Sequence, residues 1–107
     1  MTTWTEFIQI RAHFDLETKD VVEAFYGLSF KRPEKDLVDI TLLRSRNIVN
    51  DFCIRLTWQG EMPRQEKSAL GYQLAEAFSK IGWINHTIWI RETSLFLQNR
   101  RNIYENQ

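Results

Sequence analysis

Residues 63–91 read PRQEKSALGYQLAEAFSKIGWINHTIWIR, and this stretch contains two different hydrophobic periods. The first part has the 3.6-residue period of a helix, with an apolar stripe at Leu70, Leu74, Phe78 and Ile81. From Trp83 onward the apolar residues alternate instead, as they do in a strand. We predict a helix that begins near Pro63, where a missing N–H is no loss, and ends at Gly82 as a left-handed C-cap. A strand with bulky residues on both faces follows.

Three other segments alternate between apolar and polar side chains, which predicts strands at residues 7–14, 37–46 and 52–59. Between the first two, an apolar stripe at Val21, Val22, Phe25 and Leu28 predicts a helix that ends before Pro33. The order is therefore strand, helix, strand, strand, helix, strand. This order predicts an α+β protein with a ferredoxin-like βαββαβ fold, in which both helices cover one face of a four-stranded antiparallel sheet.

Length and composition restrict the class of protein. We expect the 107 residues to form one domain, with a core at about residues 5–93 and a C-terminal tail at 94–107. The chain has 14 Lys and Arg and 14 Asp and Glu, so no broad basic surface for nucleic acid is expected. No apolar run is long enough to span a membrane. With a single cysteine, Cys53, and no signal-peptide pattern at MTTWTEF, we expect a reducing, cytoplasmic location.

The chain contains no motif that predicts a cofactor or a metal. There is no glycine-rich phosphate loop, nucleophile elbow or metalloprotease motif. Two histidines and Cys53 at scattered positions do not supply the three or four clustered ligands of a metal site. His86 falls among isoleucines, which is typical of a hydrogen-bonded core or edge histidine. Gly71 in mid-helix indicates that another element approaches closely.

The faces of the predicted strands that point away from the helices are mixed in character. They carry Phe7, Leu37, Leu43 and Trp89 (or Ile88 in the other register), together with Arg11, His13, Asp39, Arg55, Thr57 and Arg91. Clustered Phe, Leu and Trp are unusual on a face left in water, and three arginines are unusual in a monomer core. We therefore predict a homodimer in which two such sheets meet face to face around a cavity.

Several residues on or near this face are candidates for ligand binding, and each has a structural alternative. His13 is the candidate catalytic base, or else a hydrogen-bonded strand histidine. The arginines Arg11, Arg55 and Arg91 either bind an anionic ligand or pair with Asp39 and with acids across a dimer interface. Aromatic residues either line an aromatic ligand site or fill the core, the interface or the surface; they are Trp58, Trp83, Trp89 and Tyr72.

The element order, together with Trp58 at the end of the third strand in the context Arg55-Leu56-Thr57-Trp58, resembles the dimeric α+β barrel superfamily. Within it, the chain is most similar to the antibiotic biosynthesis monooxygenase-like group, over residues 7–91. The resemblance implies a homodimer and a cofactor-independent monooxygenase acting on an aromatic or quinol-type compound. Haem-degrading members have a histidine early in the helix that follows this tryptophan. Residues 64–68 contain none, so the resemblance does not imply haem breakdown.

Two functions are therefore expected as alternatives. The first is a small-molecule-binding domain for an aromatic or anionic ligand, with the monooxygenase activity that the resemblance implies. The second is a non-catalytic dimerisation or regulatory module. A pocket with converging polar groups distinguishes the first from the second.

Overall fold

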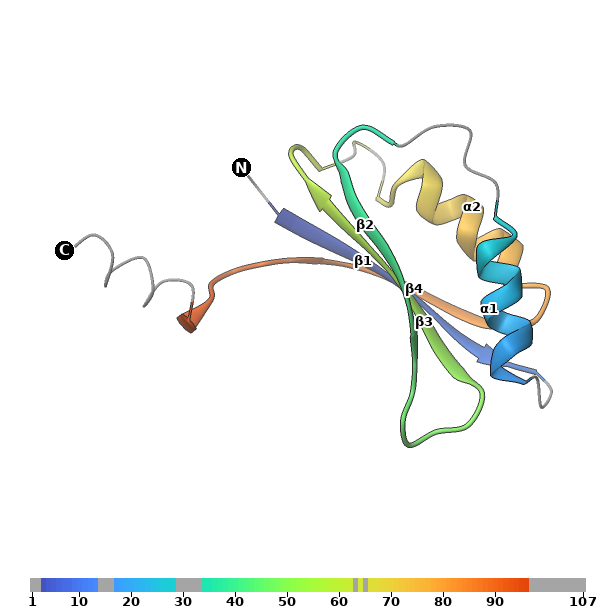
Figure 1. The fold of residues 1–107 in the computed structure, drawn as a ribbon. Coiled ribbons are helices and arrows are strands. Elements are labelled where there is room, and N and C mark those ends of the chain that lie inside the picture. The colour runs from blue at the N-terminus through green and yellow to red at the C-terminus, as the bar shows by residue number, and fades with distance from the viewer. Residues whose placement is uncertain (1–2, 14–16, 29–33, 63, 65, 97–107) are drawn as a thin grey trace, which may run out of the picture.

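The computed structural model describes residues 3–13, 17–28, 34–62, 64 and 66–96. These residues form β1 (Thr3–Ala12), α1 (Thr18–Tyr26), β2 (Leu37–Arg44), β3 (Asp51–Gln59), α2 (Ala69–Phe78) and β4 (Gly82–Ile90). The strands pair in one antiparallel sheet in the order β2-β3-β1-β4, and both helices lie against the same face of it (Figure 1). The predicted α+β, ferredoxin-like βαββαβ fold is confirmed.

The core lies between this face and the two helices. In the central strands β1 and β3 every second side chain is buried, which confirms the predicted apolar face of residues 52–59. The helices contribute Val21 from α1 and Leu70, Leu74 and Phe78 from α2. Burying each large apolar side chain contributes roughly 1.5–3 kcal/mol, so the central strands and α2 hold the fold together.

The bounds of α2 differ from the prediction at both ends. The helix begins at Ala69 because Ser68, in an extended conformation, accepts a hydrogen bond from the Gly71 N–H at 2.8 Å and so caps it. Pro63, the predicted first turn, lies outside the described residues. The predicted left-handed C-cap at Gly82 is wrong. Gly82 is the first residue of β4, where a Cβ would overlap the Arg11 carbonyl of β1.

Strand β1 begins four residues earlier than predicted, at Thr3 rather than Phe7. It therefore adds Trp4 and Glu6 to the face that the helices cover. At its other end it stops at Ala12, so His13 follows the strand, and Phe14 lies outside the described residues. Helix α1 ends at Tyr26, before Pro33 as predicted.

Strand β2 corrects the predicted position of Leu37. Leu37 pairs with Trp58 and Asp39 pairs with Thr57, so Val38 is an extra residue at a bulge. A bulge reverses the facing of every residue on one side of it. Leu37 therefore packs against the core and not on the opposite face, and Val38 is exposed.

The end of the described chain leaves the sheet. After β4, residues 91–96 run away from the body of the domain (Figure 1). Leu95 and Phe96 are both exposed. The remainder of the predicted tail, residues 97–107, lies outside the described residues.

Candidate functional site

One face of the sheet is not covered by either helix, and we call it the open face. It carries the outward side chains of β1, β3 and β4, among them Phe7, Arg11, Cys53, Arg55, Thr57, Trp83, Asn85, Thr87 and Trp89. The indoles at its ends are the most accessible, with Trp83 65% and Trp89 61% exposed. Trp89, and not Ile88, lies on this face, which settles the register of the last strand.

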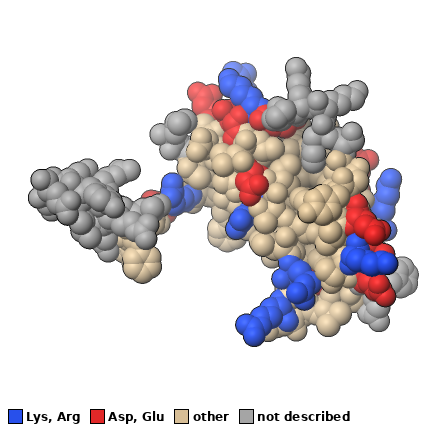
Figure 2. All heavy atoms as spheres, in the orientation of Figure 1, with Lys and Arg blue, Asp and Glu red and all other residues tan. Residues whose placement is uncertain are grey.

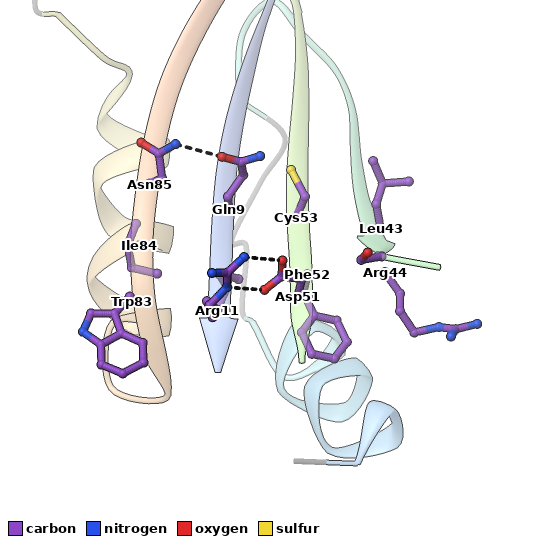
Figure 3. Close-up of a pocket in the computed structure, with 12 residues that line it drawn as sticks. Gln9, Arg11, Leu43, Arg44, Asp51, Phe52, Cys53, Trp83, Ile84 and Asn85 are labelled. Carbon is purple, nitrogen blue, oxygen red and sulfur yellow. Dashed lines mark hydrogen bonds and ion pairs between the residues drawn. The ribbon is translucent and has the colours of Figure 1, made fainter. Parts of the chain in front are cut away.

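A pocket of about 550 Å³ lies at one end of the open face. Figure 3 shows it between the ends of β4, β1 and β3, with Arg11 and Asp51 facing each other across adjacent strands and Trp83 at the edge. The Arg11 Nε donates to Asp51 Oδ1 at 2.8 Å, and Nη2 donates to Oδ2 at 2.9 Å. These bonds lower the pKa of the Asp51 carboxyl below its ordinary value. The charge of Arg11 is thus already matched within the chain.

Arg55 occupies the middle of the open face. It lies on β3 opposite Phe7 of β1 and Thr41 of β2, and its Nε is buried with no hydrogen-bond partner within the described chain. Asp39, its predicted partner, accepts a hydrogen bond from the Thr41 hydroxyl at 2.6 Å. Cys53 lies two residues before Arg55 on β3, and burial raises the pKa of its thiol. The open face therefore holds a guanidinium with an unused buried donor.

The other candidates on this side do not converge on one point. His13 lies edge-on against Trp83, with 4.2 Å between the ring centroids. The indole of Trp89 donates to the Thr87 hydroxyl at 3.0 Å, and Arg91, just beyond β4, donates to the Thr3 hydroxyl at 3.4 Å. The two exposed tryptophans are six positions apart along β4, which corresponds to roughly 20 Å. His13 and Arg11 are thus at one end of the sheet, Arg91 and Trp89 at the other, and Arg55 between them.

Two of the aromatic candidates lie on the helix side. Trp58 is 6% exposed and stacks on Trp4 with 5.2 Å between ring centroids, so it packs in the core. The indole nitrogens of both residues are buried without a hydrogen-bond partner in the described structure. Tyr72, on the outer side of α2, approaches the ring of His86 edge-on at 5.9 Å.

Sequence reasoning missed a buried ion pair on this helix side. Glu6 is 0% exposed, and its Oε2 lies 2.7 Å from His86 Nε2, whose side chain is 7% exposed. The expectation of a hydrogen-bonded core histidine is thus confirmed, but its partner was not foreseen. The alternation of side chains along a strand could have predicted its burial, because Glu6 lies two residues before Ile8 and therefore on the same buried face. The prediction began β1 at Phe7 and left Glu6 outside the strand.

The N-terminus of α2 closes over this pair. The Ser68 N–H points to Glu6 Oε2 at 3.4 Å, and a carboxylate at this end of a helix is favoured by the helix dipole. A Cβ on Gly71 would lie 2.8 Å from His86 Nε2 and closer still to Glu6 Oε2. The predicted close approach at Gly71 is therefore confirmed, and Glu6 and His86 are what it accommodates.

A second cleft, of about 370 Å³, opens beside His86. We call it the β4 cleft; its lining residues are Glu66, Lys67, His86, Thr87, Ile88 and Trp89. The other carboxylate oxygen of the pair, Glu6 Oε1, is buried and has no hydrogen-bond partner among the described residues. An imidazole held by a carboxylate at the edge of a cleft can accept or donate a proton.

The surface and the comparisons add no other kind of site. On the side seen in Figure 2, positive and negative side chains lie close together at the top and right, in keeping with the net charge of zero. Among the described residues, no group of three or more His, Cys, Asp or Glu could hold a metal ion. In the same part of the chain, no helix is both long and apolar enough to cross a membrane.

Comparison with protein-family models, with curated proteins and with solved structures finds no match for this chain.

Proposed function

We propose that this chain is a small-molecule-binding domain that works as a homodimer, with a small aromatic anion held between the two open faces. The observation that carries the proposal is the buried, unpartnered Nε of Arg55 in the middle of the open face. A buried donor without a partner costs about 1–3 kcal/mol, so the position favours an occupant that supplies an acceptor. A carboxylate or phenolate supplies one with the matching charge.

The character of the open face supports a second copy as the partner. It exposes Trp83 and Leu43 at one end and Trp89 at the other, and water solvates such apolar side chains poorly. Arg11 is neutralised by Asp51 within the chain, and Arg55 and Asp39 are opposite charges that two copies can pair across an interface. Such a reciprocal pairing is self-complementary, as an isologous dimer requires.

The finer proposal is oxygenation of a phenol- or quinol-type compound by O₂ without a cofactor, in a reducing compartment such as the cytoplasm. It rests on the resemblance of the element order and Trp58 to the monooxygenase-like group. Two exposed indoles on the open face give an aromatic compound surfaces to stack on. Oxygen consumption in the presence of such compounds distinguishes turnover from binding alone.

One observation favours the alternative, a non-catalytic dimerisation module. Arg11, which lines the open-face pocket, is already paired in bidentate fashion with Asp51. If Arg55 is likewise satisfied by Asp39 of a second copy, the guanidinium in the middle of the face is not left over for a ligand. The two functions then differ in what removing Arg55 does to the dimer.

Replacing Arg55 by methionine distinguishes them. For a ligand-binding arginine, Arg55→Met should leave the melting temperature and the dimer intact and abolish the stabilisation that aromatic carboxylates or phenols give the parent. Arg46→Met, in the exposed β2–β3 turn, is the matched control and should behave as the parent. The measurement is thermal melting with a panel of these compounds, and oxygen uptake with the same panel. Marked destabilisation of Arg55→Met, with no compound shifting the parent, would leave only the dimerisation module.

A further inference from the structure

The Glu6–His86 pair lies where an ordinary protein core would carry apolar side chains. It is surrounded on its strand face by Trp4, Ile8 and Leu56, and Glu6 is the one charged residue that is fully buried in the described chain. Apolar residues of similar volume usually serve stability at least as well as a buried ion pair. Packing alone therefore does not account for the pair, and buried ionisable groups beside clefts are candidates for function.

The hydrogen bond between His86 and Glu6 determines which ring nitrogen of His86 is the donor and which is the acceptor. With Nε2 donating its proton to Glu6 Oε2 at 2.7 Å, the neutral ring carries its lone pair on Nδ1. Within the described residues, Nδ1 has no hydrogen-bond partner. A carboxylate on the far nitrogen holds the ring in place. Nδ1 is thus a positioned proton acceptor at the edge of the β4 cleft.

The lining of the β4 cleft indicates what kind of molecule meets that acceptor. Ile88 and Trp89 give it an apolar and aromatic wall, and its lining carries one cation, Lys67, and one carboxylate, Glu66. Its volume of about 370 Å³ is near the lower end of the range for small-molecule sites. An aromatic ring with one ionisable hydroxyl matches all three features, because its ring packs on the wall, its proton meets His86 and its anion meets Lys67.

We propose that the β4 cleft is a binding site for a weakly acidic phenol- or enol-type compound, and that His86 takes the proton from its hydroxyl. The O–H bond breaks and its electron pair stays on oxygen, while a new N–H bond forms at His86 Nδ1. The resulting imidazolium is held by the Glu6 carboxylate, and the oxyanion by Lys67. No oxidant or cofactor enters the step. Glu6 is a positioning residue, since it acts through His86.

The proton-accepting pair and the open face lie on opposite sides of the sheet. The open-face pocket and Arg55 lie on the side away from the helices, whereas Glu6 and His86 lie beneath α2. Trp89 belongs to both surfaces, because it lines the β4 cleft and is exposed on the open face. His86→Gln removes the base of the β4 cleft and Arg55→Met removes the open-face guanidinium, so the two proposals can fail separately.

The test uses 4-nitrophenol, whose neutral and ionised forms absorb at different wavelengths. At a pH where the free compound is mostly neutral, adding the parent protein should increase the absorbance of the nitrophenolate. His86→Gln keeps a hydrogen-bond donor for Glu6, so the domain should fold, but it has no base. It should lower the phenolate fraction of the bound compound about tenfold, equivalent to one pKa unit of the compound. Glu6→Gln should lower this fraction while retaining binding.

Controls separate the site from its surroundings. Lys67→Met should weaken binding of the phenolate, whereas Lys80→Met, in the exposed segment just after α2, should match the parent. If His86→Gln does not fold, the ¹⁵N chemical shifts of His86 in the parent give the answer, because 4-nitrophenol should protonate Nδ1. The proposal is overturned if the parent does not bind 4-nitrophenol. It is equally overturned if the bound compound stays neutral or if His86→Gln ionises it as well as the parent does.

Discussion

Replacing His86 by leucine should destabilise the domain by about 3–5 kcal/mol, because it leaves a buried carboxylate without its partner. Glu6 is 0% exposed, and its Oε1 already has no hydrogen-bond partner in the described chain, so the only compensation left is the long 3.4 Å contact from the Ser68 N–H. Urea unfolding of parent and variant at neutral pH measures the difference.

The control removes both partners at once. Glu6→Leu combined with His86→Leu replaces the ion pair by apolar residues in an apolar surround, and it should regain most or all of the stability that His86→Leu loses. The double-mutant cycle thus separates the cost of a stranded charge from the loss of packing. If the double variant is as unstable as His86→Leu, packing around the histidine ring, and not the charge, sets the cost.

Gly71→Ala should also destabilise the domain, by about 1–3 kcal/mol, although alanine is the better helix former. Glycine to alanine within an open helix gains roughly 1 kcal/mol. At this position the new methyl group would overlap Glu6 Oε2 and lie 2.8 Å from His86 Nε2, so it must displace the pair. Forcing extra volume into a packed core carries the larger cost. Urea unfolding of the parent and the variant shows directly whether the free energy of unfolding falls or rises.

Two further variants show whether the carboxylate is the obstacle. Gly27→Ala lies at the exposed end of α1, where the backbone is helical and the nearest atom to the new methyl group would be the Glu23 carbonyl oxygen at 3.2 Å, so it should cost much less than Gly71→Ala. In a Glu6→Ala background the nearest obstacle is gone and the His86 ring, with Nε2 at 2.8 Å, remains, so Gly71→Ala should cost less than in the parent. An equal cost in both backgrounds would mean that Glu6 is not what requires glycine here.

The fold could be predicted because hydrophobic period and element order both point to it. Alternation over residues 52–59 corresponds to a central strand with the predicted buried face, and the helical stripe of α2 is buried at Leu70, Leu74 and Phe78. Element ends were predicted less well, because they depend on single hydrogen bonds. Ser68 caps α2, and no period reveals which of several polar residues will do so.

The residues of the candidate site could be predicted only in part from the sequence, because their positions also depend on local details. Residue parity placed Arg55 on the open face correctly and left Trp89 and Ile88 as alternatives, and one bulge at Val38 was enough to move Leu37 to the other side. The pairing of Arg11 with Asp51 depends on strand register, which the sequence pattern does not fix. Glu6 was missed because a charged residue at the start of a strand is normally expected to face solvent. Only its buried partner, His86, explains why it faces the core.

The central claim is that the open face is completed by a second copy of the chain. An uncovered sheet face with exposed Trp83 and Trp89 and a buried unpartnered Arg55 Nε is the basis for it. Light scattering coupled to gel filtration measures the mass in solution without reference to shape. The account predicts twice the chain mass of 12.8 kDa at micromolar concentration. A stable species of 12.8 kDa under the same conditions would contradict it.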